Sequence, residues 1–194
     1  ALDHDEGLNT GGMGTVAPNP YYTSDIAKEC MEKIFLPTIE GMKKEGRTFK
    51  GCLYFGLMLT ADGPKVIEYN CRFGDPEAQV VLPLLESDLL EVMQAVTEER
   101  LAEQEVKFSS GAACCVVMAS DGYPKKYEKG YEITIEDSVK DYVYVAGAKI
   151  VDGKLLTDGG RVLGVIAKGD DIAKAIDAAY KNVDFVHFDN EYYR

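Results

Sequence analysis

The chain has 194 residues, of which 46% are hydrophobic, so it can fold as one large domain or two small ones. This composition excludes disorder over most of its length. The 33 acidic and 21 basic residues give a net charge of −12, and the longest basic runs are pairs, which argues against a protein that coats nucleic acid. No segment approaches the roughly 20 apolar residues of a membrane helix, and the first residues are not a signal peptide. We expect a soluble, cytoplasmic protein with no nucleic-acid or membrane partner.

Cysteine and histidine usage limits the possible metal chemistry. The five cysteines are an odd number and contain no Cys-x-x-Cys pair, so neither a disulfide framework nor a zinc knuckle is indicated. Only two histidines are present, His4 and His187, so any metal must be held by oxygen ligands. The chain also begins in polar sequence that leads straight into a glycine cluster, which is typical of the interior of a longer polypeptide. We therefore expect a fragment.

The first 70 residues are predicted to contain a broken helix and a hairpin. Glycine and proline are too frequent in residues 1–22 for regular structure, which predicts a loop. A helix is predicted from Thr23 to about Gly46, with a break or kink at Pro37. The apolar run at 51–60, the turn at 61–64 and the short apolar run at 65–69 predict an antiparallel hairpin.

The remaining sequence alternates between helical and strand-like patterns. Helical patterns follow Glu77 and cover about 89–97, the second of them capped by Ser87-Asp88. Apolar periodicity stops in the charged stretch 98–107, which predicts a linker with a boundary near residue 103. Strands are predicted at 112–119, 131–135, 143–150, 154–157 and 161–167, with turns at 152–153 and 158–160, and a final helix runs from a cap at Asp170-Asp171 to about Val183.

The strongest local indication of chemistry lies at the end of the second hairpin strand. Alternation along a strand points Glu68 and Asn70 to the same side, and Arg72, just beyond the strand, can reach that side. A carboxylate and a carboxamide oxygen suit Mg²⁺, which prefers hard oxygen ligands and completes its shell with waters and phosphates. Arg72 would offer a planar, permanently charged fork to a phosphate or carboxylate. The alternative is an exposed strand face with an ordinary Glu–Arg pair.

Two further segments are candidates for substrate binding. In Asn9–Gly14 the glycines allow close backbone approach and positive φ, so successive N–H groups could form a concavity for an anion. The segment lacks the GK[ST] of a P-loop, and a mobile surface loop is the alternative. Asp75 precedes Pro76, which restricts it to an extended conformation, and either a helix N-cap or a carboxylate facing a ligand fits that position.

Four blocks taken together resemble one family. These are Asn9–Gly14 (NTGGMG), Val66–Glu77 (VIEYNCRFGDPE), Val117–Pro124 (VMASDGYP) and Asp158–Val165 (DGGRVLGV). In this order they resemble the blocks of the phosphoribosylamine–glycine ligases, also called glycinamide ribonucleotide synthetases, of the ATP-grasp superfamily. The resemblance spans essentially the whole chain. It implies an α+β fold in which residues 1–102 form the C-terminal lobe of an ATP-grasp domain and residues 103–194 form a small β-rich C-terminal domain with a closing helix.

The resemblance also implies an activity and roles for particular residues. ATP would phosphorylate glycine to an acyl phosphate, and the amine of 5-phosphoribosylamine would attack it, giving an amide, ADP and phosphate in purine biosynthesis. Glu68 and Asn70 match the family's ligands for Mg²⁺ or Mn²⁺, and Arg72 matches a catalytic position that contacts phosphate or the acyl phosphate. The six residues of the first block, Asn9, Thr10, Gly11, Gly12, Met13 and Gly14, match segments that line the substrate side, as does Asp75.

The sequence departs from the family pattern in two ways. Many ATP-grasp enzymes carry a second acidic metal ligand about twelve residues before the Glu of this motif, and Gly56 stands there in this chain. The chain also lacks the N-terminal lobes of such an enzyme, so we expect it to be inactive alone. The alternatives are another ATP-grasp carboxylate–amine ligase and a non-catalytic nucleotide-binding module.

Overall fold

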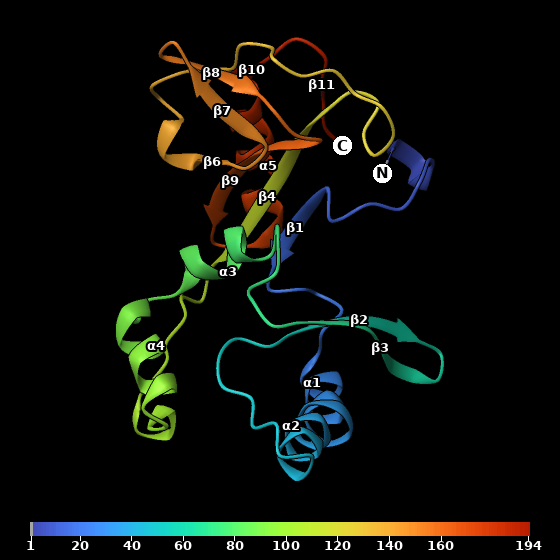
Figure 1. Cartoon of the computed structure of the whole chain (residues 1–194), viewed down its shortest axis with the longest axis vertical. Coiled ribbons are helices and arrows are strands. Elements are labelled where there is room, and N and C mark those ends of the chain that lie inside the picture. The colour runs from blue at the N-terminus through green and yellow to red at the C-terminus, as the bar shows by residue number, and fades with distance from the viewer. Residues whose placement is uncertain (1) are drawn as a thin grey trace. The chain divides into compact units, whose positions relative to one another are not determined.

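The computed structural model describes residues 2–194 and divides into two compact units (Figure 1). Unit 1 comprises the chain up to Ala17, Asp75–Leu84 and Ser109–Arg194, whereas unit 2 comprises Pro18–Gly74 and Leu85–Phe108. Mixed helices and antiparallel sheet in these units agree with the predicted α+β class. The units are defined by contacts between residues, and each combines segments that are separate in the sequence. Residue 103 lies inside unit 2, so the boundary between family domains at that residue stays a prediction.

Unit 1 is built on an antiparallel sheet whose central strand is completely buried. The strands run in the order β1-β4-β9-β6, and β11 also pairs with β4 (Figure 1). Every residue of β4 is buried, because its nine-residue apolar run has a neighbour on each side and helices over both faces. The bounds are β1 Gly14–Ala17, β4 Ala112–Ser120, β6 Val143–Val145, β9 Arg161–Gly169 and β11 Glu191–Tyr192.

The two faces of this sheet carry separate hydrophobic clusters. Alternation along β4 directs Val116 and Met118 into the cluster with helix α5 (Ile172–Val183). Cys115 and Val117 point to the other face and pack with helix α3 (Ala78–Leu84). Asp171 caps α5 by accepting a hydrogen bond from the Lys174 backbone N–H. The position of α3 matters for the site because this helix follows Asp75 directly.

Smaller elements complete unit 1. Strands β7 (Ala148–Val151) and β8 (Lys154–Thr157) form a hairpin, and the predicted Asp152-Gly153 turn is confirmed with positive φ at both residues. The single strand predicted at 143–150 is wrong, since Gly147 separates β6 from β7. The reason is a close crossing, because a Cβ on Gly147 would lie 2.7 Å from the Cα of Gly159. The remaining elements are β5 Thr134–Ile135, β10 Val186–His187 and the 3₁₀ turns Asp3–Asp5 and Lys140–Tyr142.

Unit 2 begins with a helix whose path is adjusted around a proline. Helix α1 (Ser24–Cys30) continues through a π-helical turn (Met31–Phe35) into α2 (Leu36–Lys44). The Leu36 N–H donates to the oxygen of Met31, five residues earlier, so the widened turn comes directly before Pro37. The predicted break at Pro37 is thus found as a π turn, because proline has no N–H to continue the regular pattern.

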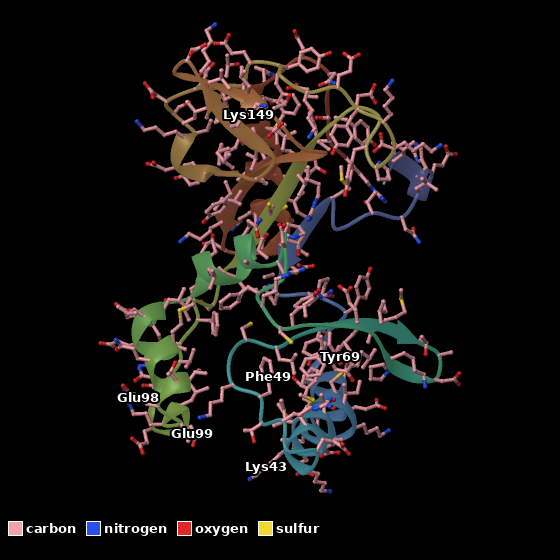
Figure 2. The ribbon with its side chains drawn as sticks, viewed as in Figure 1. Lys43, Phe49, Tyr69, Glu98, Glu99 and Lys149 are labelled. Atoms are coloured by element: carbon pink, nitrogen blue, oxygen red, sulfur yellow. The ribbon has the colours of Figure 1, made fainter. Side chains whose placement is uncertain are left out.

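The predicted hairpin is confirmed as strands β2 (Tyr54–Thr60) and β3 (Gly63–Asn70). Aromatic rings attach it to the helices of unit 2: the Phe55 ring lies 4.4 Å from that of Phe35 and 5.3 Å from that of Tyr69. The Tyr69 hydroxyl also lies 3.4 Å from Oγ1 of Thr38 on α2. Figure 2 shows Tyr69 on the side of the hairpin that faces α1 and α2.

The charged stretch 98–107, predicted as a linker, folds back within unit 2. It follows α4 (Leu89–Thr97), which Asp88 caps by accepting from the N–H groups of the first turn, and it includes the 3₁₀ turn Leu101–Glu103. The Glu86 N–H donates to the Lys107 oxygen, and the Lys107 N–H donates to Oγ of Ser87. Among the residues described, no helix is both long enough and apolar enough to cross a bilayer.

Candidate functional site

Glu68, Asn70 and Arg72 form one hydrogen-bonded series at the end of β3. The Asn70 amide nitrogen donates to Oε1 of Glu68 at 2.9 Å, and Nη2 of Arg72 donates to Oδ1 of Asn70 at 3.3 Å. Tyr69, between them in sequence, points toward the helices of unit 2 (Figure 2), so alternation directs Glu68 and Asn70 to the opposite face. The structure therefore brings together the three residues that the sequence predicted to lie together.

Arg72 is held by its own local backbone. Its Nη1 donates to the Phe73 oxygen at 2.8 Å, while Nη2 takes the Asn70 contact. Arg72 and Glu68 are exposed and Asn70 is half-buried, so the charged groups are open to ligand. A guanidinium fixed at one end and exposed at the other can present its planar donors to a phosphate or a carboxylate.

A β-bulge directly before Glu68 shapes this strand end. The register between β2 and β3 shifts between Gly56 and Leu57, so that Ile67 has no partner and Glu68 lies opposite Gly56. A Cβ on Gly56 would lie only 2.8 Å from Cγ of Glu68. The Glu68 side chain thus lies across the space that a residue larger than glycine would fill. Gly56 stands where many ATP-grasp enzymes carry a second acidic ligand, and its lack of a side chain leaves room for Glu68.

The donor set at this strand end is consistent with a divalent cation held partly by other molecules. Within residues 2–194, no group of three His, Cys, Asp or Glu side chains is placed to hold a metal ion. Glu68 and Asn70 supply one carboxylate and one carboxamide within hydrogen-bond distance of each other. Mg²⁺ is commonly bound in this way, with few protein oxygens and the rest of its shell from water and phosphate. The residue types therefore fit such a cation, but the Asn70 nitrogen faces Glu68 and its oxygen accepts from Arg72, so the amide has to turn before both oxygens can face one cation.

The glycine cluster of Asn9–Gly14 belongs to unit 1, where it leads into β1. None of Gly11, Gly12 and Gly14 has a positive φ, so the left-handed backbone considered from the sequence is not what these glycines provide. They are required for close approach: a Cβ on Gly12 would lie 2.7 Å from the Pro76 ring, and one on Gly14 would lie 2.9 Å from the Cys115 oxygen. Of the other residues in this segment, Asn9 is exposed and Thr10 is half-buried.

Hydrogen bonds fix the far end of this loop. The oxygen of Met13 accepts from the Val117 N–H at 3.1 Å, and pairing of β1 with β4 begins at Gly14. The Met13 side chain packs on the cluster under α3. The loop therefore has a defined path over the edge of the sheet.

Arg161 joins this loop to Asp75. Its Nη1 donates to the oxygens of Gly12 at 3.2 Å and Asp75 at 2.9 Å, and its Nη2 lies 3.0 Å from Oδ2 of Asp75. The Arg161 side chain is 23% exposed, compared with 49% for Asp75. At the start of β9, the Arg161 backbone is itself held by the Gly147 N–H, which donates to the Arg161 oxygen at 3.0 Å. The two segments predicted to line the substrate side thus share one guanidinium.

Asp75 also holds the first turn of α3. Its Oδ1 accepts from the Gln79 amide nitrogen at 2.9 Å. This partner is a side-chain nitrogen and not a backbone N–H of the first turn, so the contact is not that of a helix N-cap. Half of the Asp75 side chain is accessible, and a carboxylate that faces a ligand stays a prediction. The neighbouring thiol of Cys115 is no nucleophile, because burial raises its pKa to about 12, with Cys114 and Asp75 acting in the same direction.

The predicted site residues thus form two groups, each described within its own unit. Glu68, Asn70 and Arg72 are linked in unit 2, while Asn9–Gly14 and Asp75 are linked in unit 1. Sequence reasoning missed Arg161 and Gln79. The DGGRVLGV block did contain a signal for Arg161, since an arginine after two glycines at a turn is well placed to reach neighbouring backbone. Gln79 lies four residues after Asp75, which is the helical spacing for a side-chain contact.

Comparison with known proteins gives matches over most of the chain. Residues 1–78 match the family described as phosphoribosylglycinamide synthetase, ATP-grasp (A) domain, and residues 113–194 match the phosphoribosylglycinamide synthetase C domain. A phosphoribosylamine–glycine ligase of Caldanaerobacter subterraneus is 48% identical over 193 residues, covering 99% of this chain and 46% of that protein. The trifunctional purine biosynthetic protein adenosine-3 of Gallus gallus is 50% identical over 196 residues, covering 99% of this chain and 20% of that protein.

The structural comparison agrees with these matches. A crystal structure of a phosphoribosylamine–glycine ligase from Thermotoga maritima superposes with a TM-score of 0.82 and 37% sequence identity, covering 99% of this chain and 48% of that one. The chain spans about half the length of the curated phosphoribosylamine–glycine ligases that it matches.

Proposed function

The chain belongs to the phosphoribosylglycinamide synthetase family, and from this membership we propose that it is the C-terminal part of a phosphoribosylamine–glycine ligase. Its α+β fold is that of the C-terminal portion of an ATP-grasp domain followed by a C domain. The proposed reaction joins glycine to 5-phosphoribosylamine through a glycyl phosphate, with release of ADP and phosphate, and yields glycinamide ribonucleotide for purine biosynthesis.

The observation that carries this proposal is the hydrogen-bonded series Glu68–Asn70–Arg72 at the end of β3. A carboxylate and a carboxamide can hold a cation, and a neighbouring guanidinium can donate to the phosphoryl oxygens, so the three groups together can serve the transfer of a phosphoryl group to a carboxylate. Such a transfer needs little covalent help, and its catalysis consists mainly of positioning and of neutralising charge on the phosphoryl oxygens. A scaffold without a site has no need to hold these three side chains together on an exposed face.

In this proposal Glu68 and Asn70 would hold Mg²⁺ or Mn²⁺. When bound, the cation supplies positive charge to the phosphate oxygens of ATP. The bulge at Ile67 and the absence of a side chain on Gly56 set the direction of Glu68, so the ligand is oriented by its own strand pair. Arg72 would donate to the transferring phosphoryl group or to the carboxylate that receives it, and it stays charged at every physiological pH.

Unit 1 would contribute to binding on the substrate side. Nη1 of Arg161 donates to the backbone oxygens of both Gly12 and Asp75, which holds the Asn9–Gly14 loop next to Asp75. We further propose that the segments of the full-length relatives that this chain does not match supply the remaining contacts to ATP and exclude water from the acyl phosphate. A cytoplasmic location is part of the same proposal, because five cysteines without a disulfide framework are typical of a reducing compartment.

The test is ADP release from ATP by the parent-length protein with Mg²⁺ and glycine, with and without freshly generated 5-phosphoribosylamine. We expect release to require both glycine and 5-phosphoribosylamine, and the chain alone to be inactive. Other amine acceptors in place of 5-phosphoribosylamine serve as controls. Release that is indifferent to glycine and 5-phosphoribosylamine would overturn the proposed substrates and favour another ATP-grasp ligase.

A further inference from the structure

A β-bulge lies at the start of β9, directly after Arg161. Met118 of β4 pairs with Leu163 of β9. The next residue of β4, Ala119, pairs with Arg161, so Val162 has no partner. A shift of one residue in a strand reverses the face on which the residues beyond it lie. The bulge therefore determines the face of the sheet from which the Arg161 side chain projects.

With the bulge, Arg161 lies on the face that carries α3. Met118 packs in the cluster under α5, and alternation along β4 directs Ala119 to the opposite face. Residues that lie directly opposite in an antiparallel pair share a face, so Arg161 follows Ala119. Without the bulge, Arg161 would lie opposite Ser120 on the face of α5, away from Asp75. The ion pair with Asp75 thus depends on this local register.

Ser120 holds the two glycines that precede Arg161. Its N–H donates to the Gly160 oxygen at 2.7 Å, and its Oγ donates to the Gly159 oxygen at 3.0 Å. Ser120 is only 1% exposed, so water cannot easily replace either hydrogen bond. Two hydrogen bonds from one buried residue therefore fix the path of the backbone that leads into Arg161.

Two further groups confine this pair of glycines. A Cβ on Gly160 would overlap the Tyr123 ring, and a Cβ on Gly147 would lie 2.7 Å from the Cα of Gly159. Both glycines are therefore packed against other parts of unit 1 as well as hydrogen-bonded to Ser120. A displacement of this segment cannot be absorbed locally, and it passes on to the next residue, Arg161.

We propose that Ser120 is a positioning residue for the substrate side of the site and that it acts through Arg161. Its hydroxyl holds Gly159, and with it the register that directs the Arg161 guanidinium to Asp75 and to the Gly12 oxygen. This inference rests on the proposed function for its kinetic test, in which the KM for glycine is the readout. Ser120 itself contacts no substrate in this proposal.

The primary test is Ser120→Ala in the parent-length protein. Alanine removes the hydroxyl and keeps the backbone N–H, so one of the two hydrogen bonds to the glycines is lost. We expect the KM for glycine in the ADP-release assay to rise about two- to tenfold, the effect of losing one hydrogen bond between neutral groups. An unchanged KM would contradict a positioning role.

A combination with Arg161→Ala separates positioning from a general loosening of the fold. If Ser120 acts through Arg161, Ser120→Ala should raise the KM for glycine in the native background and leave it unchanged once Arg161 is replaced by alanine. A merely structural hydroxyl would raise the KM by the same factor in both backgrounds, because independent effects on free energy add. Equal factors would therefore overturn the inference.

Ser87→Ala is the matched control. Ser87 also joins separate segments through its hydroxyl, which donates to the Glu105 oxygen at 3.2 Å and accepts from the Lys107 N–H at 2.8 Å, but it does so in unit 2. We expect Ser87→Ala to lower the free energy of unfolding and to leave the KM for glycine unchanged. A rise equal to that in Ser120→Ala would show that the KM follows stability alone.

Gly160→Ala reaches the same segment without touching Ser120, and it keeps the inference open to refutation if Ser120→Ala folds poorly. The new Cβ would overlap the Tyr123 ring, so the backbone before Arg161 must move. We expect the KM for glycine to rise, and Tyr123→Ala in the same chain to restore part of it by removing the ring. Glycine-dependent release with an unchanged KM in both Ser120→Ala and Gly160→Ala would overturn the inference and leave the proposed function intact.

Hydrogen–deuterium exchange tests the inference without a substrate. Arg161 holds the loop that leads into β1, so Ser120→Ala should accelerate exchange in Gly14–Ala17, with no further acceleration in the Arg161→Ala background. Release that never depends on glycine would overturn the proposed function. Native exchange of Gly14–Ala17 in Ser120→Ala would overturn the role of Ser120, whichever substrates the protein uses.

Discussion

Arg161 and Asp75, 86 positions apart in the sequence, form an ion pair in which Nη2 lies 3.0 Å from Oδ2. The other terminal nitrogen of the same guanidinium donates to the backbone oxygens of Asp75 and Gly12. Because the donors of an arginine have fixed directions, this contact sets the glycine-rich loop and the Asp75 segment relative to each other. Within unit 1 it is a positioning contact that both predicted substrate segments share.

Removal of this side chain should weaken the fold and the substrate side together. We expect Arg161→Ala to lower the free energy of unfolding by about 1–2 kcal/mol. This value is in the lower part of the range for charge-assisted hydrogen bonds, because Asp75 is 49% exposed and water can replace part of the lost hydrogen bonding. Urea unfolding followed by circular dichroism measures this change. In the parent-length protein the KM for glycine should rise, and Arg161→Lys should recover only part of it, because lysine lacks the planar fork.

Arg100→Ala is the matched control for Arg161. Arg100 pairs with Glu98 at 2.5 Å, and both side chains of that pair are exposed in unit 2. We expect Arg100→Ala to leave both the unfolding curve and the KM for glycine unchanged. Equal effects of the two substitutions would contradict a positioning role for Arg161.

The parts of this site that could be predicted from sequence are those governed by local geometry. Alternation along β3 places Glu68 and Asn70 on one face whatever the rest of the chain does, and an arginine two residues later is within reach of that face. In the same way, Asp88 and Asp171 could be recognised as helix caps, because a cap contacts only the next few N–H groups.

The parts that could not be predicted depend on contacts between distant segments. Arg161 binds Asp75 across 86 positions, and nothing in either local sequence specifies the partner. The strand break at Gly147 arises from its crossing with Gly159, and the bulge at Ile67 arises from the register of the facing strand. A period of two in the sequence fixes which residues share a face, but not where pairing is interrupted.

Glu68→Gln tests the proposed metal ligand. The amide keeps the size of the side chain but removes its negative charge, so we expect the Mg²⁺ concentration for half-maximal ADP release to rise about 10- to 100-fold in the parent-length protein. Glu40→Gln, at an exposed position of α2, is the control and should leave the Mg²⁺ dependence unchanged. Native rates at low Mg²⁺ in Glu68→Gln would exclude a role as ligand.

Gly56→Ala tests the orientation of Glu68 without altering its charge. The new Cβ would meet Cγ of Glu68 at 2.8 Å, so the carboxylate must turn away from its present direction. We expect a higher Mg²⁺ requirement than in the native protein, but a smaller change than in Glu68→Gln.

Gly41→Ala provides the same substitution where space is free. No heavy atom lies within 4 Å of its added Cβ, and the position is inside helix α2, so this variant should raise the free energy of unfolding by about 0.5–1 kcal/mol and leave the Mg²⁺ dependence unchanged. A Mg²⁺ requirement that is native in Gly56→Ala would show that the space over Gly56 does not position the ligand.

The buried thiol of Cys115 predicts a loss of stability in alkali. Burial raises its pKa from 9.0 to about 12 in the folded chain, so between these values the unfolded chain releases a proton that the folded chain keeps. Its contribution to stability is therefore fully present below pH 9 and is lost at about 1.4 kcal/mol per pH unit as the pH rises toward 12.

Cys115→Ala removes this contribution and should be compared with Val117→Ala, which truncates a side chain on the same face of β4 without removing a thiol. Both variants should be less stable than the native chain at pH 7 in urea unfolding. The deficit of Cys115→Ala should shrink between pH 9 and pH 11, whereas that of Val117→Ala should stay constant. Parallel pH profiles for the two variants would contradict the raised pKa.

Arg72→Ala distinguishes transition-state stabilisation from substrate binding. Arg72 is exposed, and among residues 2–194 its side chain hydrogen-bonds to Phe73 and Asn70, so its removal should leave the fold intact. If its guanidinium neutralises charge that develops on the transferring phosphoryl group, kcat for ADP release in the parent-length protein should fall about 10²- to 10³-fold, with a smaller change in the KM for glycine.

The kinetic pattern decides between the two roles of Arg72. Arg72→Lys keeps the charge but loses the planar fork, so it should recover part of kcat if charge is what matters and little if two parallel hydrogen bonds are needed. Arg47→Ala, at an exposed arginine after α2, is the control and should leave kcat unchanged. A rise confined to the KM for glycine in Arg72→Ala would make this side chain a substrate clamp, because uniform loss of binding changes KM and leaves kcat as it was.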